Sequence, residues 1–245
     1  MLSNVTLPLL GSGMLAVAGG LAGYYATYAV RSQWLGDTEW HGRRDTGAVA
    51  LTFDDGPSRD TERILDVLGE HNVTASFFMI GRQVETFPGI AQRVLAEGHE
   101  VGNHSYSHPI YLYHRPSLTH QELEHAQTVI SETTGILPRF ARPPCGVRTP
   151  AYFAATRSLG LRTVQWDVAG FDWRQRSAKQ IAADVLRGAR AGSIVLLHDG
   201  DSDGKRDRRE TVAAVPLIIK GLHDKGLHVA PLNELLSNDD VESAV

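Results

Sequence analysis

The chain has 245 residues, of which 42% are apolar and 21% are charged, and this composition excludes a disordered or fibrous protein. A chain of that length can bury one sizeable core. The net charge is −4 at pH 7 and no basic stripe is interleaved with aromatic residues, so the sequence gives no case for nucleic acid as a partner. The single cysteine, Cys145, excludes an internal disulfide framework.

The N-terminal residues differ from the rest because no charged side chain precedes Arg31. Residues 5–30 are mostly apolar or small, and a helix of about 20 such residues spans a bilayer. Aromatic side chains gather where an interfacial belt would lie, namely Tyr24, Tyr25, Tyr28 and Trp34. We therefore expect residues 1–30 to form a hydrophobic helix that anchors the protein in a membrane. A cleaved signal peptide is the alternative, although its usual basic n-region is missing.

Residues 31–46 are polar and without periodicity, and we expect them to be a linker. From residue 47 onward, short apolar runs bounded by turn residues predict strands. These runs are 48–53, 74–78, 100–102, 139–141, 162–168, 193–197 and 227–230.

Helical patterns lie between the predicted strands. Ile64, Val67 and Leu68 follow the i, i+3, i+4 spacing of a helix face. Capping boxes predict helices that start at Thr119 and Ser177, and a further helix over about 210–224 includes Pro216. Strands that alternate with helices indicate parallel βα units, in a barrel or a doubly wound sheet, and make 47–245 one domain.

Each polar cluster taken alone has an ordinary structural explanation. Asp54 and Asp55 after the first strand suit a turn and a helix cap as well as a site. His104 and His108 are spaced to reach one metal ion, but an exposed pair of this kind can also be idle. His198 at the end of an apolar run suits a core histidine.

Their shared position is more informative. The two aspartates, His104, Arg142, Asp167 and His198 all fall at or near the carboxyl end of a predicted strand. Catalytic residues collect on that face of a βα barrel. One carboxylate and two imidazoles give three ligands for a catalytic metal, which leaves a position open for water. A second carboxylate serves as general base and another imidazole as general acid, so the set matches metal-assisted hydrolysis of an amide or ester.

Five segments resemble motifs of one family, in its order and spacing: Thr52-Phe-Asp-Asp-Gly-Pro57, His104-Ser-Tyr-Ser-His108, Arg142-Pro-Pro-Cys-Gly146, Asp172-Trp173 and Leu196-Leu-His198-Asp199. The family is the polysaccharide deacetylases (carbohydrate esterase family 4), and the resemblance covers about residues 48–236. It implies a distorted (β/α)7 barrel, a divalent metal and a substrate that carries N-acetylglucosamine, such as chitin, peptidoglycan or a lipid-linked glycan.

The resemblance also implies roles for single residues. Asp55, His104 and His108 correspond to the metal ligands, Asp54 to the general base and Arg142 to the residue that orients this base. Zinc is the expected metal, although two imidazoles and one carboxylate also suit cobalt or nickel.

The remaining roles concern the substrate. His198 corresponds to the general acid, and Trp173 and Leu196 to the pocket for the acetyl methyl group. The backbone N–H of Cys145 corresponds to an oxyanion-hole donor at a position where the family more often has Tyr or Phe.

One position departs from the family pattern. The family usually has an aspartate that supports the acid histidine three residues before the position of Asp172, and this sequence has Ala169 there. Asp167 is the expected substitute because it lies two residues back and leaves an extended strand on the same face. The departure also leaves open a degenerate relative that binds metal and glycan without turnover. A magnesium-dependent phosphatase is disfavoured because magnesium prefers oxygen ligands.

Two arguments conflict over topology. Arg31, Arg43 and Arg44 follow the hydrophobic segment, which by the positive-inside rule places the domain in the cytoplasm. Resemblance to cell-wall enzymes favours an extracytoplasmic domain, which is the expectation adopted here. The sequence contains no signal for an oligomeric state.

Overall fold

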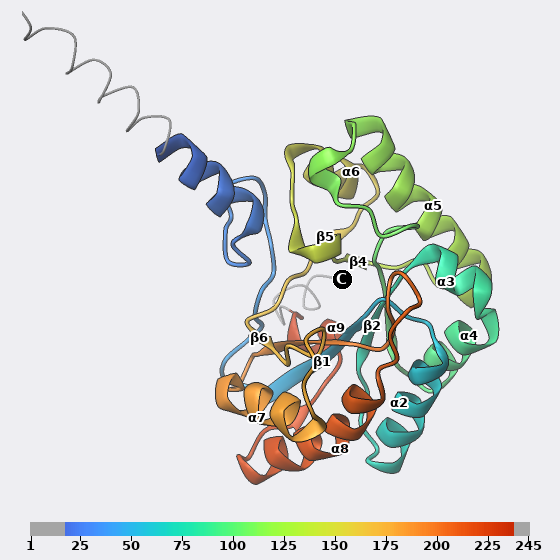
Figure 1. The fold of residues 1–245 in the computed structure, drawn as a ribbon, viewed down its shortest axis with the longest axis vertical. Coiled ribbons are helices and arrows are strands. Elements are labelled where there is room, and N and C mark those ends of the chain that lie inside the picture. Colours follow the sequence, from blue (N-terminus) through green and yellow to red (C-terminus); the bar gives the residue numbers. More distant parts are fainter. Residues whose placement is uncertain (1–17, 238–245) are drawn as a thin grey trace, which may run out of the picture.

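The computed structural model describes residues 18–237 (Figure 1). Its centre is an eight-stranded sheet in which the strand order is β5-β4-β3-β2-β1-β7-β6, and β8 pairs with β1. Every pairing between these eight strands is parallel. The strands are β1 (Ala48–Asp54), β2 (Ser76–Met79), β3 (Glu100–Asn103), β4 (Phe140–Ala141), β5 (Arg162–Thr163), β6 (Val168–Ala169), β7 (Ile194–His198) and β8 (His228–Val229).

Helices surround this sheet and connect its strands (Figure 1). They are α2 (Arg59–Glu70), α3 (Gly81–Thr86), α4 (Pro88–Ala96), α5 (Pro116–Thr134), α6 (Pro150–Ser158), α7 (Ala178–Gly188), α8 (Arg209–Asp224) and α9 (Leu232–Leu235). The expected parallel β/α architecture is confirmed in the form of a parallel half-barrel, because β5 and β6 lie at opposite ends of the strand order.

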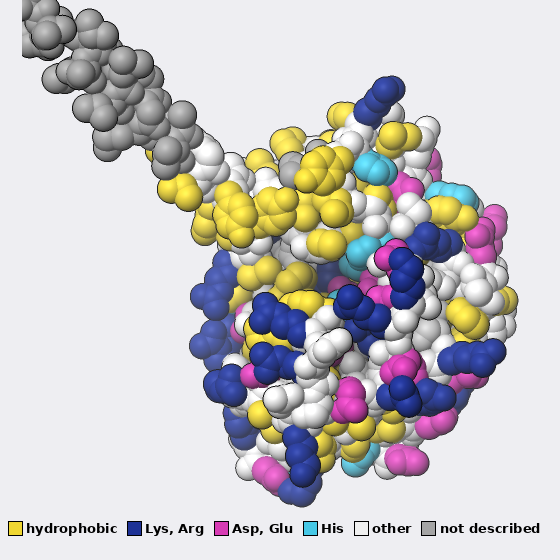
Figure 2. Space-filling view, viewed as in Figure 1, with side chains coloured by type: hydrophobic (Ala, Val, Ile, Leu, Met, Phe, Trp, Pro, Cys, Tyr) yellow, Lys and Arg dark blue, Asp and Glu magenta, His cyan; other side chains and the backbone are white. Residues whose placement is uncertain are grey.

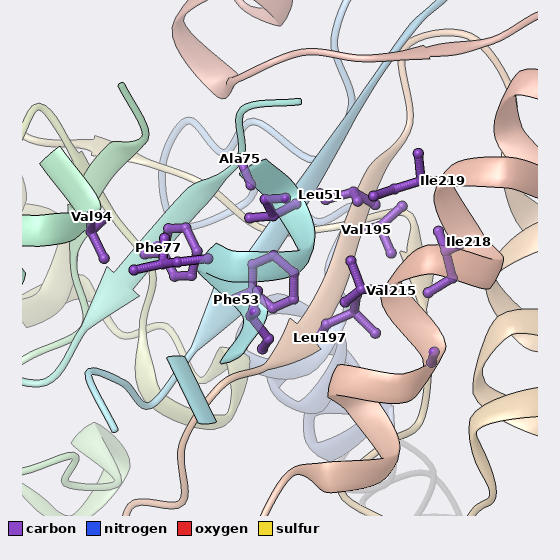
Figure 3. Packing of buried hydrophobic residues seen from close by; sticks show 14 of the residues in the cluster. Leu51, Phe53, Ala75, Phe77, Val94, Val195, Leu197, Val215, Ile218 and Ile219 are labelled. Atoms are coloured by element: carbon purple, nitrogen blue, oxygen red, sulfur yellow. The ribbon is translucent and has the colours of Figure 1, made fainter. Parts of the chain in front are cut away.

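The core lies between the sheet and these helices. All seven residues of β1 are buried, as expected for a central parallel strand covered on both faces. Phe53 stacks on Phe77 of β2, and Val215 and Ile218 of α8 belong to the same buried cluster (Figure 3). Burial of each such side chain contributes about 1.5–3 kcal/mol, so this packing holds the carboxyl ends of the strands in place.

The predicted strand over 162–168 is wrong as a single element. The chain forms β5, leaves the sheet, and returns as β6 at the other end of the strand order. Residues 39 and 41 lie in the opening between these ends, since Glu39 bridges to Val164 and His41 bridges to Ser193.

The segment 31–46, predicted as a linker, therefore pairs in part with the domain. Residues 18–28 are helical, and the fully buried Arg148 holds the segment that follows them. Its guanidinium donates to Ser32 O at 3.1 Å and to Ala29 O, and its backbone N–H donates to Thr27 O at 3.2 Å.

The expected anchor over 1–30 falls largely on residues 1–17, which lie outside the described part of the chain. Within residues 18–237, no helix combines the length and the apolar character needed to cross a membrane.

Candidate active site

A cavity of about 380 Å³ opens at the carboxyl ends of the strands. Asp54 ends β1 and His198 ends β7, and the two residues are register partners on adjacent strands. His104 directly follows β3, and Arg142 directly follows β4. Figure 2 shows histidine and acidic side chains within a hollow in this face of the molecule. The sheet therefore brings the residues predicted from strand ends to one place.

Three of these residues form a cluster of potential metal ligands. One ligand atom from each of Asp55, His104 and His108 lies within 4.8 Å of the others. Asp55 Oδ1 is 3.5 Å from His104 Nε2 and 3.3 Å from His108 Nε2. The structure thus brings together the set of ligands expected from the sequence.

The cluster also fits a metal by its chemistry. His104 Nδ1 lies 2.7 Å from Arg142 O, and because a carbonyl can only accept, Nδ1 carries the proton. Its Nε2 is then the nitrogen with a free lone pair, and it faces Asp55. Burial, followed by the neighbouring His108, lowers the pKa of His104 to about 3, so the ring is neutral. Asp55 Oδ1 is buried and accepts no hydrogen bond from the described residues, as expected of an oxygen that binds a cation.

Asp54 lies beside this cluster and is held from the other side. Its Oδ1 accepts from Arg142 Nη1 at 2.7 Å, and its Oδ2 lies 3.7 Å from His104 Nε2. Arg142 is fully buried and also donates to Thr52 Oγ1 at 2.8 Å and Gln165 O at 3.0 Å. Burial raises the pKa of Asp54 although Arg142 opposes the shift, and a carboxylate with a raised pKa accepts a proton more readily.

His198 has a carboxylate partner on the side away from the cavity. Asp172 Oδ1 lies 2.8 Å from His198 Nδ1, and Asp172 Oδ2 accepts from the His198 backbone N–H at 2.7 Å and from Thr211 Oγ1 at 2.9 Å. Burial alone lowers the pKa of His198, but the carboxylates of Asp172, Asp55 and Asp54 together raise it to about 9. The ring is therefore protonated at neutral pH, and Nε2 is the nitrogen left to act in the cavity.

The polysaccharide deacetylase family profile matches residues 41–164, which include the segments of Asp54, Asp55, His104, His108 and Arg142. The chain belongs to this family.

Relatives and a solved structure extend the match beyond the profile. The chain is 39% identical over 199 residues to a chitooligosaccharide deacetylase of Bradyrhizobium sp. (strain ANU 289), and this match covers 78% of this chain and 91% of the relative. It is 36% identical over 188 residues to the peptidoglycan-N-acetylglucosamine deacetylase PgdA of Listeria monocytogenes, and this match covers 76% of this chain but only 38% of the Listeria protein. The crystal structure of the Bc1960 peptidoglycan N-acetylglucosamine deacetylase superposes with a TM-score of 0.76 at 34% identity, covering 81% of this chain and 92% of that one.

The expected substrate-binding residues of this deacetylase domain also line the cavity. They are Cys145, Trp173 and Leu196. The Trp173 ring centroid is 5.5 Å from that of His198, so an aromatic side chain adjoins this histidine. The oxyanion role of the Cys145 backbone stays a prediction.

Asp167 does not support His198. Its carboxylate accepts from the Ile194 backbone N–H at 3.0 Å and pairs with Arg44 at 3.2 Å, at the other end of β7. Asp172 occupies the position beside the histidine instead. The expectation failed on register: Val168 and Ala169 pair with Val195 and Leu196, so Asp167 lies beside Ile194, four residues before His198.

Sequence reasoning also missed a function for Asp199. This buried carboxylate accepts from the Gly56 backbone N–H at 3.0 Å and from Thr61 Oγ1 at 2.6 Å, and so holds the turn that follows Asp55. Burial raises its pKa to about 7 although Thr61 opposes the shift. The sequence signal that could have indicated this function is the position of Asp199 directly after His198, at the end of a predicted strand.

Backbone strain is concentrated at the same site. Within the described part of the chain, six residues other than glycine have positive φ, and five of them are at or beside the cavity: Asp55, Ser105, His108, Cys145 and Phe171. Such conformations cost about 1–3 kcal/mol each and persist where the surrounding contacts enforce them. Three of the five, Asp55, His108 and Cys145, line the cavity.

Proposed function

We propose that this chain is a metal-dependent deacetylase that removes N-acetyl groups from an amino-sugar glycan and releases acetate. The observation that carries the proposal is one cavity that brings together three potential metal ligands, a held carboxylate, Asp54, and a protonated imidazole, His198. The named relatives act on chitooligosaccharides and on peptidoglycan, which supports a substrate containing N-acetylglucosamine.

Asp55, His104 and His108 would hold the metal, for which zinc is the first candidate and cobalt or nickel are alternatives. When bound, such an ion polarises the amide carbonyl and makes water more acidic. The protein residues then divide the proton transfers between them.

Asp54 takes one proton from the attacking water, using Oδ2 because Arg142 occupies Oδ1. The water oxygen forms a bond to the acetyl carbon, and the backbone N–H of Cys145 donates to the oxygen that gains negative charge. His198 Nε2 gives its proton to the sugar nitrogen as the C–N bond breaks. The products are acetate and a free amino sugar, and Trp173 and Leu196 would receive the acetyl methyl group.

The degenerate, non-catalytic alternative was favoured by Ala169. Asp172 now supplies the carboxylate contact to His198 that Ala169 cannot make. We therefore infer that turnover is retained.

Acetate release tests the proposal. The purified chain is incubated with N-acetylated chito-oligosaccharides and with peptidoglycan, and Asp54→Asn serves as the matched inactive control. We expect acetate and free amines from the unmodified protein only. Metal and glycan binding without acetate from either substrate would support the non-catalytic alternative.

We propose further that the N-terminal segment attaches the domain to a membrane on the extracytoplasmic side. Leu21, Tyr24, Tyr25 and Tyr28 follow helical i, i+3, i+4, i+7 spacing and are all exposed, with Leu21 at 66%. An exposed apolar helix face of this kind suits the interface of a bilayer. A reporter fused after Val245 is expected to be active outside the cytoplasm, and activity only in the cytoplasm would reverse the assignment.

A further inference from the structure

A second cavity, of about 720 Å³, adjoins the catalytic one. It lies between the segment that follows β6 and the loop that joins β7 to α8. Trp173, Arg206 and Arg208 line both cavities, so a chain of sugars in the first can extend into the second. Six basic residues line the second cavity: Arg174, Arg176, Lys205, Arg206, Arg208 and Arg209.

The acidic residues that line this cavity already have partners. Asp172 is bound to His198, and Asp207 pairs with Arg209 at 2.9 Å. Glu210 accepts from the Ala178 backbone N–H at 2.6 Å.

Three of the other basic residues have carboxylates nearby from outside the lining of this cavity. Arg176 lies 2.9 Å from a carboxylate oxygen of Asp184. Lys205 and Arg208 lie 3.5 Å and 3.7 Å from Asp203 and Asp201, respectively.

Arg206 and Arg174 remain. Arg206 donates to the backbone oxygen of Trp173 at 3.1 Å, and the Arg174 guanidinium lies 5.2 Å from the centroid of the Phe171 ring. Both of these side-chain contacts are to neutral groups, and within residues 18–237 neither guanidinium forms an ion pair with a carboxylate, although the Arg206 backbone N–H donates to Asp201 Oδ2 at 3.2 Å. Both side chains are exposed, and Figure 2 shows basic side chains gathered beside the central hollow.

We propose that the second cavity is a subsite for an anionic group, a carboxylate or a phosphate, carried by the glycan next to the sugar that is deacetylated. A guanidinium binds either group through two parallel hydrogen bonds, and two guanidinium groups without a carboxylate in an ion pair are available to attract it. Arg206 is the principal residue because it lines both cavities. The subsite thus makes this domain selective for acidic glycans or phosphate-linked sugars over neutral chitin-like chains. This proposal rests on the proposed deacetylase function.

Selectivity between matched substrates tests the subsite. We measure kcat/KM for an N-acetylglucosamine oligomer that carries carboxylates on neighbouring sugars and for the neutral oligomer of equal length. The ratio of the two values is the anionic-to-neutral selectivity. A third substrate, a phosphate-linked N-acetylglucosamine, distinguishes phosphate from carboxylate as the natural group. In R206Q we expect the anionic-to-neutral ratio to fall by about tenfold through a higher KM, as for the loss of one charge-assisted contact.

Arg157→Gln is the matched control, because this exposed arginine of α6 lines neither cavity. It is expected to leave the ratio unchanged, and added salt is expected to lower the ratio in the unmodified protein. An equal ratio in R206Q and the unmodified protein, with neutral glycan still deacetylated, would overturn the subsite alone. No acetate from any of the three substrates would instead overturn the deacetylase function.

Discussion

Replacement of Asp172 by Asn tests how His198 is kept protonated. The side chains are nearly isosteric, but the variant loses the charge that lies 2.8 Å from His198 Nδ1. Asp172 makes the largest contribution among the groups that raise the pKa of His198 to about 9. Burial, which lowers this pKa, remains in the variant. We expect the pKa of His198 to fall by roughly 2 units, which corresponds to about 3 kcal/mol of differential stabilisation of the charged ring.

The sign of the effect on rate follows from the function of the histidine. A general acid must carry its proton, so activity is lost as pH rises through its pKa. The alkaline limb of the kcat/KM profile is therefore expected to move about 2 units to lower pH in Asp172→Asn. Turnover at neutral pH is expected to fall by about 100-fold, because the ring also loses its fixed orientation.

Asp167→Asn is the matched control for this experiment. It removes another buried carboxylate close in sequence, but one that binds Ile194 N and Arg44 instead of the histidine. We expect its alkaline limb to stay in place. An unchanged limb in Asp172→Asn, or an equal shift in both variants, would refute the reasoning.

Three further predictions concern the ligands, the base and the N-terminal segment. His104→Ala is expected to abolish bound metal, as measured by elemental analysis. The control is His120→Ala, which removes an exposed histidine outside the cluster and is expected to keep the metal. Full metal occupancy in His104→Ala would contradict the assignment. Asp54→Asn is expected to keep the metal but lose at least about 100-fold in turnover, and loss of both together would make Asp54 a ligand instead of the base. Arg148→Met leaves buried carbonyls such as that of Ser32 without a hydrogen-bond donor, so the free energy of unfolding measured in urea is expected to fall by roughly 3 kcal/mol. An unchanged unfolding midpoint would show that the N-terminal segment is held by other contacts.

The central strands and the ligand set could be predicted because their signals are local. Buried apolar runs such as 48–53 mark strands of a parallel sheet, and their carboxyl ends share one face whatever the details of the barrel. Asp55, His104 and His108 follow from that rule and from the motifs. The Ser177 capping box predicted the start of α7, and the box is present in the structure.

Other features depend on contacts that carry no local signal. The helix expected to start at Thr119 begins at Pro116, because Thr119 is buried inside α5, where its hydroxyl binds the carbonyl of Arg115. The run 162–168 is apolar enough for one strand, yet the sheet opens within it. Residues 39 and 41 bridge to the two sides of that opening only once the sheet exists, so their polar surroundings suggested a linker.

The choice between Asp167 and Asp172 shows a related limit. Alternation along a strand was the basis for Asp167, but the register of β6 on β7 places Asp167 beside Ile194, at the far end of β7 from His198. Asp172 binds the histidine instead, and it follows a turn in which Phe171 has a φ of 53°. A positive φ at phenylalanine has no signature in the sequence, because it is enforced by the surrounding fold.

Metal reconstitution during turnover tests the central claim most directly. The purified chain is freed of metal with a chelator, and zinc is titrated back while bound metal and acetate release from an N-acetylated oligosaccharide are measured together. We predict that acetate release is lost on chelation and returns in proportion to bound zinc up to one ion per chain, held by Asp55, His104 and His108. Undiminished acetate release from the metal-free protein, or full zinc binding without any acetate, would contradict a metal-dependent deacetylase.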